Sequence, residues 1–475
     1  MVRNTIINLL EGKKTYWSLL LLNFIVGLLI FILTGKTLGG DYETYNSLAD
    51  GLLTGNYSMY HFLPQYFPDT FRNPGYPVFL AFFKLFSSSL LLIQVAQLLL
   101  YFATIFLILN IIDHYFEKRL VIKNIFLLLL SGSIYIAIYT PSIAPEILMC
   151  FMMTLSFWID IKLSDKKYFK YLLLGLLYGF IFQVRPVFLF FPLLKFILDW
   201  IVLKKEFLLR KNSIILVIYV LTMIPYGLWN YNNHGVFSIT SLRGGAEVLN
   251  AGYWAQKIPG YKEDRSFANT FFEEPILFIN RADKEKNIEL YNKEWDFIDS
   301  SCARFLTLND SFQINLWHTG QYHFPATLSG RYTMERERLI KAATINDMMH
   351  DKMYVIKSKL YSAVRLWVTG VQIENFRKAT LSGKFILLIP MLLTGTIFLL
   401  SVLFIPIAFI KYKFLFTKLY SILILIIYYG LIHVPFVIQS RYTIPVRMLL
   451  LLVLAVSIYH LFLKEKSGKS EIQKS

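Results

Sequence analysis

Charged residues and cysteines are scarce in this sequence, and each shortage excludes a class of protein. Only 17% of the 475 residues are charged, whereas 56% are hydrophobic and 17% are aromatic. A soluble domain carries roughly a quarter charged residues and a disordered chain carries few aromatic ones, so neither class fits. The two cysteines, Cys150 in an apolar run and Cys302 in a distant polar region, are not expected to meet, and no disulfide framework is predicted. The composition indicates a polytopic membrane protein and leaves its redox compartment open.

Acidic residues are outnumbered by basic ones, 31 against 48, which gives a net charge of +17. In a soluble protein such an excess would suggest nucleic acid as a partner. Here the basic residues gather in short loops between apolar runs, at 118–123, 166–170, 204–211 and 411–418. The positive-inside rule makes these loops cytoplasmic, and the alternation of spans places both termini in the cytoplasm. The positive net charge therefore indicates which loops are cytoplasmic, and it predicts no nucleic-acid partner.

Apolar runs predict an all-α polytopic membrane protein with about ten transmembrane helices, because a span needs about 20 mainly apolar residues. The clear runs are residues 16–34, 90–112, 124–140, 146–163, 213–229, 385–410, 419–438 and 442–463. The stretch 171–203 is broken by Arg185 and Pro186 and is predicted to form two short helices that meet at the outer face.

The spans and loops divide the chain into three parts. Residues 1–231 are predicted to form an N-terminal transmembrane module that includes a first outer loop, 35–89. Residues 232–383 form a large outer loop or lobe of mixed structure, and residues 384–475 form the last spans and a cytoplasmic tail. Near the end of the lobe, residues 349–370 carry apolar side chains at helical spacing. This stretch is predicted to be an interfacial helix.

The first outer loop is dense in aromatic residues. Apolar side chains recur at helical spacing after Asp41, which predicts an amphipathic helix on the membrane that ends at Gly55. Residues 72–77, Arg-Asn-Pro-Gly-Tyr-Pro, form a rigid turn, and the short apolar stretch 78–86 is predicted to dip into the interface. Taken by itself, Asp41 would suit the N-cap of the predicted amphipathic helix. A carboxylate, an arginine and a stiff turn in one aromatic loop favour a functional role instead.

These residues carry a resemblance to a known family. Asp41 with the pattern Ala49-x-x-Leu-x-x-Gly and Arg72-x-Pro-Gly-Tyr-Pro-x-Phe-Leu-Ala resembles the bacterial GT-C glycosyltransferases related to protein mannosyltransferases and the lipid A aminoarabinose transferase. Further segments fit by their order and side of the membrane. They are Ser-Ile-Ala-Pro-Glu at 142–146, Gln-Val-Arg-Pro at 183–186, Trp-Asn-Tyr at 229–231 with Gly-Val-Phe at 235–237, and Gln-Ser-Arg-Tyr-Thr-Ile-Pro at 439–445.

The resemblance implies an inverting transfer of a sugar from a polyprenyl-phosphate carrier at the outer face of the membrane. Such a reaction needs a carboxylate that accepts the proton of the attacking hydroxyl, and cations that bind the leaving phosphate. Asp41 is predicted to be the general base, and Glu146 the second carboxylate, which orients the acceptor, shares the base role or helps to hold a divalent metal. Arg185 is the first candidate for the donor phosphate, assisted by Arg72 and Arg441.

Simpler explanations stand beside these roles. Glu146 follows Pro145 and also suits an acid at a helix N-terminus. Arg72 and Arg441 also suit anchors at the interface. Tyrosines 42, 45 and 76 are predicted to stack on sugar or lipid, and they equally fit an aromatic belt. Tyr42, Tyr45 and Tyr76 remain candidate substrate-binding residues. No metal site or cofactor is predicted with certainty, and no Walker or dinucleotide motif occurs.

The sequence thus predicts a glycosyltransferase of the bacterial inner membrane, with a polyprenyl-phosphate-linked sugar as donor and an envelope lipid, glycan or protein as acceptor. One alternative is a transporter or flippase for a lipid-linked saccharide, which would place ionisable residues near the bilayer midplane. Another is an envelope polysaccharide polymerase or ligase, which typically depends on arginines and histidines of the loops rather than on an early aspartate.

Overall fold

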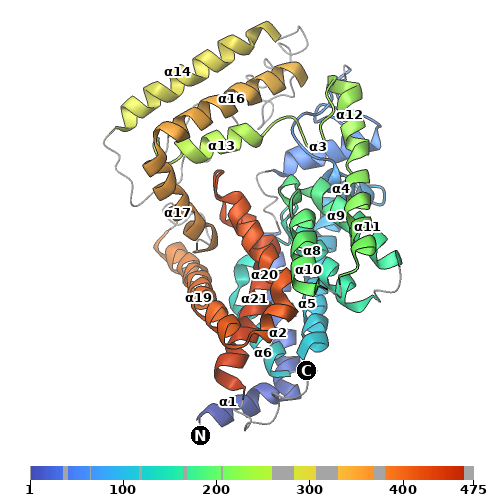
Figure 1. Cartoon of the computed structure of the whole chain (residues 1–475), viewed down its shortest axis with the longest axis vertical. Coiled ribbons are helices and arrows are strands. Elements are labelled where there is room, and N and C mark those ends of the chain that lie inside the picture. The colour runs from blue at the N-terminus through green and yellow to red at the C-terminus, as the bar shows by residue number, and fades with distance from the viewer. Residues whose placement is uncertain are drawn as a thin grey trace.

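A computed structural model describes residues 2–35, 41–64, 66–116, 120–163, 168–204, 207–258, 261, 283–305, 330–368 and 380–464. These residues form helices and connecting loops, with no strand among them. Figure 1 shows a long helical bundle with a helical lobe over one end, called the lobe end below. Helix α1 (Val2–Glu11) lies at the opposite end of the bundle, where the last helix also finishes.

The first half of the chain supplies the larger part of the bundle. Its helices are α2 (Lys13–Thr34), α3 (Tyr42–Leu53), α4 (Gly75–Lys84), α5 (Leu90–Phe116), α6 (Leu120–Gly132), α7 (Ile134–Ala137), α8 (Glu146–Lys162), α9 (Tyr168–Val184), the 3-10 turn η1 (Pro186–Phe188), α10 (Phe191–Leu203), α11 (Leu209–Leu221) and α12 (Ile224–His234). The lobe contains α13 (Gly245–Trp254), α14 (Lys284–Cys302), a 3-10 turn (Ala303–Phe305), α16 (Gly330–His350) and α17 (Lys352–Val368). The chain returns through α19 (Leu381–Lys411), α20 (Phe414–His433), the 3-10 turn η5 (Ser440–Thr443), α21 (Ile444–Ile458) and a final π-helical turn (Tyr459–Leu463).

The all-α polytopic fold predicted from the apolar runs is confirmed. Seven segments of the described chain are long and apolar enough to cross a membrane: Lys13–Thr34, Leu90–Phe116, Pro186–Leu203, Leu209–His234, Leu388–Lys411, Phe414–His433 and Arg441–Leu463. The shorter apolar helices α6 and α9 occupy two further predicted runs. The predicted run 124–140 is interrupted at Ser133, where α6 gives way to the single turn α7.

The break predicted within 171–203 is also present. Helix α9 ends at Val184, and α10 begins only after η1. Arg185, which precedes Pro186, has φ −145° and ψ 112°. Proline disfavours the helical conformation in the residue before it and lacks an N–H for the helical ladder, which accounts for the end of α9 at this point. Arg185 is therefore held in an extended link between two helices.

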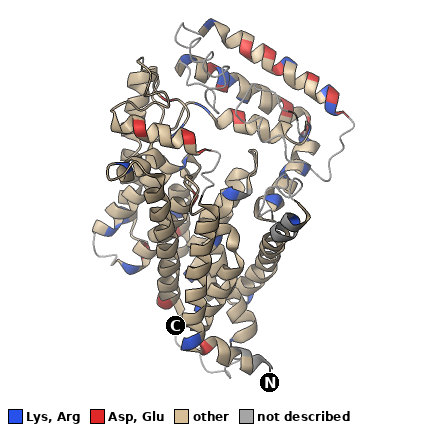
Figure 2. Ribbon diagram, turned by 180° about the vertical axis from the view of Figure 1, so that it is seen from behind, with Lys and Arg blue, Asp and Glu red and all other residues tan. Residues whose placement is uncertain are grey.

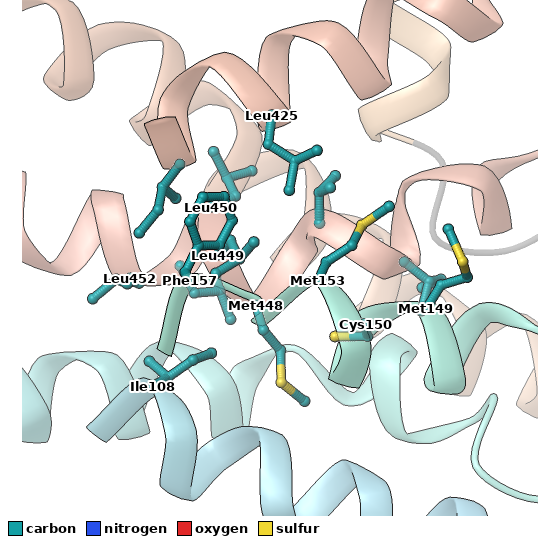
Figure 3. Packing of buried hydrophobic residues seen from close by; sticks show 14 of the residues in the cluster. Ile108, Met149, Cys150, Met153, Phe157, Leu425, Met448, Leu449, Leu450 and Leu452 are labelled. Atoms are coloured by element: carbon teal, nitrogen blue, oxygen red, sulfur yellow. The ribbon is translucent and has the colours of Figure 1, made fainter. Parts of the chain in front are cut away.

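Helix α21 forms the centre of the bundle. Every residue from Ile444 to Ser457 is buried, whereas helices α2 and α19 bury only 17% of their most apolar stretches. Helices α2 and α19 are as apolar as α21, so it is the packing of other helices around α21, and not its composition, that makes it the core. Figure 3 shows Met448, Leu449, Leu450 and Leu452 of this helix in one apolar cluster with Met153 and Phe157 of α8 and Leu425 of α20. Residues at the lobe end of α21 are thereby attached to the most rigid part of the molecule.

A buried ionic network ties four helices together at the end opposite the lobe. Lys195 Nζ lies 2.5 Å from Asp199 Oδ2 and 3.3 Å from Asp160 Oδ2. Lys170 Nζ lies 2.9 Å from the other oxygen of Asp160, and the Tyr420 hydroxyl donates a 2.7 Å hydrogen bond to Asp199. Each charge has an opposite partner, which a buried charge requires. Helices α8, α9, α10 and α20 are held in register by these pairs.

The described part of the lobe is helical, where a mixed structure was expected. Helix α14 buries Tyr291, Trp295, Ile298 and Cys302, which recur every three or four residues and form one helix face. They pack with residues of α13 and α16 in a cluster separate from the bundle core. Figure 2 shows acidic and basic residues mixed along the lobe helices, while the middle of the bundle carries few charges.

Candidate functional site

Five charged residues from distant parts of the sequence meet at the lobe end of the bundle. Asp41 immediately precedes α3, Arg72 lies in the turn before α4, and Glu146 is the first residue of α8. Arg185 lies between α9 and η1, and Arg441 lies in η5 just before the central helix α21. Each residue thus stands at a helix end, where the backbone is fixed by the bundle. We refer to these five residues as the charged cluster.

Arg441 connects the two carboxylates of the cluster. Its Nη2 lies 2.7 Å from Asp41 Oδ2, and its Nε lies 3.8 Å from Glu146 Oε1. Arg72 Nη2 lies 2.9 Å from the other Asp41 oxygen, and Arg185 Nη2 lies 2.5 Å from Glu146 Oε1. The three arginine side chains are only 14–20% exposed, and the Glu146 side chain is fully buried. The predicted carboxylates and arginines therefore form one connected network.

Asp41 does not act as a helix cap. It is the residue before α3, yet its side chain makes no capping hydrogen bond and is directed to the two arginines. Burial by itself raises the pKa of this carboxyl. The guanidinium groups of Arg441 and Arg72 outweigh burial and hold the pKa of Asp41 well below its usual range. Asp41 is ionised at neutral pH and is a weak base as long as both arginines bind it.

The charged cluster retains unused binding capacity. Three guanidinium groups against two carboxylates leave one net positive charge. Among the described residues, the buried Glu146 Oε2 accepts no hydrogen bond, and the buried Arg72 Nε donates none. An anionic ligand that also carries a hydroxyl group would balance the excess positive charge. It could accept a hydrogen bond from Arg72 Nε and donate one to Glu146 Oε2. Both carboxylates contact guanidinium groups, and no group of three metal-binding side chains occurs in the described chain.

Aromatic rings surround the cluster, and two of the three predicted tyrosines belong to them. The Tyr45 ring lies 4.9 Å below the Arg72 guanidinium and contacts the Tyr76 ring edge-on. Tyr442, which was not predicted, lies 5.4 Å from the Arg185 guanidinium and 6.0 Å from that of Arg441. Tyr42 lies outside this group, and its hydroxyl interacts with Glu43.

Two buried glutamines of α5 position the segment that precedes Glu146. The Gln97 side-chain amide donates to the carbonyls of Thr140 at 3.0 Å and Ser142 at 2.7 Å, and Gln94 donates to the Pro141 carbonyl at 2.8 Å. The Tyr76 hydroxyl donates to Gln97 Oε1 at 2.9 Å. The first outer loop and the segment before Glu146 thus share one hydrogen-bonded side chain. Two polar residues in an otherwise apolar span were the available signal for them.

Asp69 shapes the turn that presents Arg72. Its Oδ2 accepts backbone hydrogen bonds from Phe71 at 2.9 Å and Arg72 at 2.8 Å. The Arg72 carbonyl accepts hydrogen bonds from the hydroxyls of Tyr57 at 2.8 Å and Tyr226 at 3.1 Å. Burial raises the pKa of Asp69 to about 6, because two backbone hydrogen bonds and Arg72 only partly offset the loss of water.

Gly75 allows the first outer loop to approach Arg185. A Cβ added to Gly75 would lie 2.4 Å from the Gln183 carbonyl carbon and 2.4 Å from the Val184 nitrogen, so the two backbones are in direct contact. Asn73 in the same turn donates a 3.2 Å hydrogen bond to the side chain of Gln183. The glycine of the Pro-Gly-Tyr-Pro turn is thus required by packing and needs no unusual backbone angle.

Comparison with known proteins gives one structural likeness. No protein-family model and no curated protein matches the chain. The chain is similar to the crystal structure of ArnT from Cupriavidus metallidurans bound to undecaprenyl phosphate, with 10% identity, a TM-score of 0.37, and 94% of this chain and 78% of that chain covered. A likeness of this degree carries no argument about substrates or catalytic residues, which depend on the charged cluster itself.

We expect Gly75→Ala to separate α4 from α9 and to pull Arg185 away from Glu146. Overpacking against backbone costs about 1–3 kcal/mol, so the thermal transition in detergent should fall by several degrees. Gly132→Ala is the matched control, since a Cβ there meets no atom within 4 Å and alanine favours a helix. Equal transitions for the two variants would contradict the close contact.

We expect Asp69 to make the protein more stable as the pH falls from about 7 to 5. Its pKa is about 6 in the folded chain and about 3.9 in an unfolded one, so only the folded chain takes up a proton in this range. The gain is about 1.4 kcal/mol by pH 5, and the full contribution of about 3 kcal/mol is reached only below about pH 4. Asp69→Asn keeps an acceptor for the two backbone hydrogen bonds and should flatten the pH dependence of the transition temperature. Asp50→Asn, at a partly exposed site, should leave the dependence unchanged, and an unaltered slope in Asp69→Asn would reject the assignment.

Proposed function

We propose that the protein is an inverting glycosyltransferase that uses a polyprenyl-phosphate-linked sugar as donor. The observation that carries the proposal is the charged cluster, in which two carboxylates and three arginines converge at the end of a transmembrane bundle with one positive charge in excess. A phosphodiester donor carries one negative charge, and its lipid tail remains in the membrane while its sugar reaches the polar zone. The type of transfer comes from the resemblance of the first-loop pattern.

The proposed reaction assigns one task to each kind of group. The oxygen of the acceptor hydroxyl attacks the anomeric carbon of the donor while the bond between that carbon and the phosphate oxygen breaks. The electron pair of the broken bond remains on the phosphate, and the hydroxyl proton passes to Asp41. Arg185, Arg441 and Arg72 bind the phosphate, whose negative charge grows during the reaction. The unpaired Glu146 Oε2 is available to accept a hydrogen bond from the acceptor or the sugar.

Donor binding would also activate Asp41. In the ligand-free arrangement, Arg441 and Arg72 each contact one oxygen of this carboxylate. A donor phosphate competes for the same two guanidinium groups, because arginine binds phosphate and carboxylate through the same planar N–H groups. As the arginines turn toward the phosphate, the pKa of Asp41 rises toward its ordinary value and the carboxylate becomes a better base. The base is therefore available mainly when a donor is present.

The location of the charges favours a transferase over a transporter. The charged cluster stands at helix ends on the lobe side, and the buried ionic network around Lys195 stands at the opposite end. A transporter would place its ionisable residues near the middle of the spans. We propose that the lobe end faces the outside of a bacterial inner membrane, with both termini in the cytoplasm. An envelope lipid, glycan or protein would then be the acceptor.

We expect Asp41→Asn to lower kcat for sugar transfer by about 10²–10⁴-fold, since general base catalysis contributes this much. The assay uses nanodiscs, radiolabelled polyprenyl-phosphate sugars and envelope lipids and glycans as acceptors. Asp50→Asn is the control, because Asp50 lies in α3, the helix that Asp41 precedes, and pairs with Lys84 outside the charged cluster. Transfer that survives unchanged in folded Asp41→Asn would reject the base role, and lipid scrambling without transfer in the wild type would favour a flippase.

We expect Arg185→Ala to weaken use of the donor by about 10²-fold in kcat/KM, because it removes a phosphate ligand and leaves Glu146 without its nearest cation. Arg185→Lys should retain part of the activity, since lysine keeps the charge but not the planar fork. Arg338→Ala in the lobe, where the side chain is 64% exposed, is the control. Donor kinetics in Arg185→Ala equal to those of the control would reject the role.

A further inference from the structure

Arg447 is a buried arginine that the charged cluster does not include. It lies on the central helix α21 and is only 8% exposed. Its Nε donates to the Thr443 hydroxyl at 2.8 Å, its Nη2 donates to the carbonyls of Trp367 at 3.2 Å and Leu366 at 3.5 Å, and its guanidinium lies 5.3 Å from the Tyr135 ring. Within the described residues no carboxylate pairs with it. All of its partners are neutral.

Part of this arrangement has a structural explanation. Helix α17 ends at Val368, and the last carbonyls of a helix lack partners within the helix. Arg447 binds two of these carbonyls and lies at the negative end of the helix dipole, which attaches α17 to the bundle. A helix end supplies only about half a negative charge. A full positive charge buried in a membrane protein is costly unless it is balanced, and the described residues balance that of Arg447 only in part.

A partly enclosed cavity of about 20 Å³ lies beside the guanidinium. Its polar lining consists of Ser133, Tyr135, Thr394 and Arg447 itself, and Trp367 contributes to the wall. A cavity of this volume accommodates one or two oxygen-sized atoms. The wall from α19 belongs to a peripheral helix, whose Leu392 and Leu399 are 60% and 57% exposed. The cavity thus lies between the rigid centre of the bundle and a helix that borders the lipid.

The cavity lies toward the lobe end of the two candidate spans Leu388–Lys411 and Arg441–Leu463. Arg447 follows Arg441 by six residues, which is about 9 Å along a helix, and its side chain leans back toward the helix N-terminus. The guanidinium therefore reaches most of the way to the level of the charged cluster. Trp367 and Tyr135 beside it are the residue types that gather at membrane interfaces. A lipid headgroup occupies this depth in a bilayer.

We propose that this pocket, which we call the Arg447 pocket, binds a phosphate-type anion at the membrane interface, with one or two phosphate oxygens beside the guanidinium. The phosphate of an anionic lipid is the source that fits the depth, and inorganic phosphate shares the same chemistry. The Arg447 pocket is separate from the donor-phosphate site proposed at the charged cluster, because no residue that lines the pocket belongs to that cluster. The inference does not depend on the proposed transfer reaction.

Lipid retention tests the pocket directly. Wild-type protein and variants are transferred from detergent with defined phosphatidylglycerol and phosphatidylcholine, and the retained lipids are counted by native mass spectrometry. Arg447→Gln keeps donors for the helix carbonyls but removes the charge, and Thr394→Met fills the cavity without altering the arginine. We expect both variants to lower retention of the anionic lipid about tenfold, as loss of one charge-assisted hydrogen bond predicts. Arg447→Lys should retain part of it, and the exposed Arg210→Gln should match the wild type.

Further arms of the experiment separate the sources and the sites. Calorimetry with inorganic phosphate in lipid-free detergent would support a soluble anion as ligand if the heat of binding disappears in Arg447→Gln while lipid retention does not change. Repeating all measurements in an Arg441→Ala background excludes anions held by the charged cluster, and sugar transfer is assayed separately, so either proposal can fail alone. Equal binding of lipid and phosphate by folded wild type, Arg447→Gln and Thr394→Met would overturn the pocket and leave Arg447 as a cap of α17.

Discussion

The carboxylate of Asp41, shared between Arg72 and Arg441, is the interaction that organises the lobe end of the molecule. It joins a residue near the first span to a residue at the head of the last one, 400 positions apart in the sequence. A buried charge that loses its partner costs several kcal/mol, so the helix ends that carry the cluster must come together or leave charges unpaired. The cluster therefore fixes how the first outer loop meets the central helix, as well as supplying reactive groups.

The apolar packing makes this arrangement rigid. Arg441 precedes α21, which is surrounded by other helices, and Arg185 is held in an extended link by the proline that follows it. Gly75 brings the first outer loop into backbone contact with the end of α9, and Gln97 joins that loop to the segment before Glu146. A site whose segments are held in place by such additional packing and hydrogen bonds keeps its geometry better than a site on free loops. The polar groups function because apolar helices position them.

The sequence predicted the features that depend on local chemistry. Apolar length located the spans, Pro186 located the break after α9, and helical spacing located α3. The residue types of the cluster also follow from what a phosphate and a nucleophile require. The shared arginines could not be predicted, because the pairing of Asp41 with Arg441 depends on the packing of distant helices. Gln97 was missed for the same reason, although a polar residue in a span was a usable signal.

The charges of the cluster also match the charge changes of the proposed reaction. Before transfer, three guanidinium groups and two carboxylates sum to one positive charge, which balances a phosphodiester with one negative charge. When Asp41 accepts the proton of the acceptor, the cluster sums to two positive charges. The leaving phosphate monoester then carries about two negative charges. Protonation of Asp41 ends the competition between its carboxylate and the phosphate for Arg72 and Arg441, so the cluster would bind the transition state more strongly than the donor, as catalysis requires.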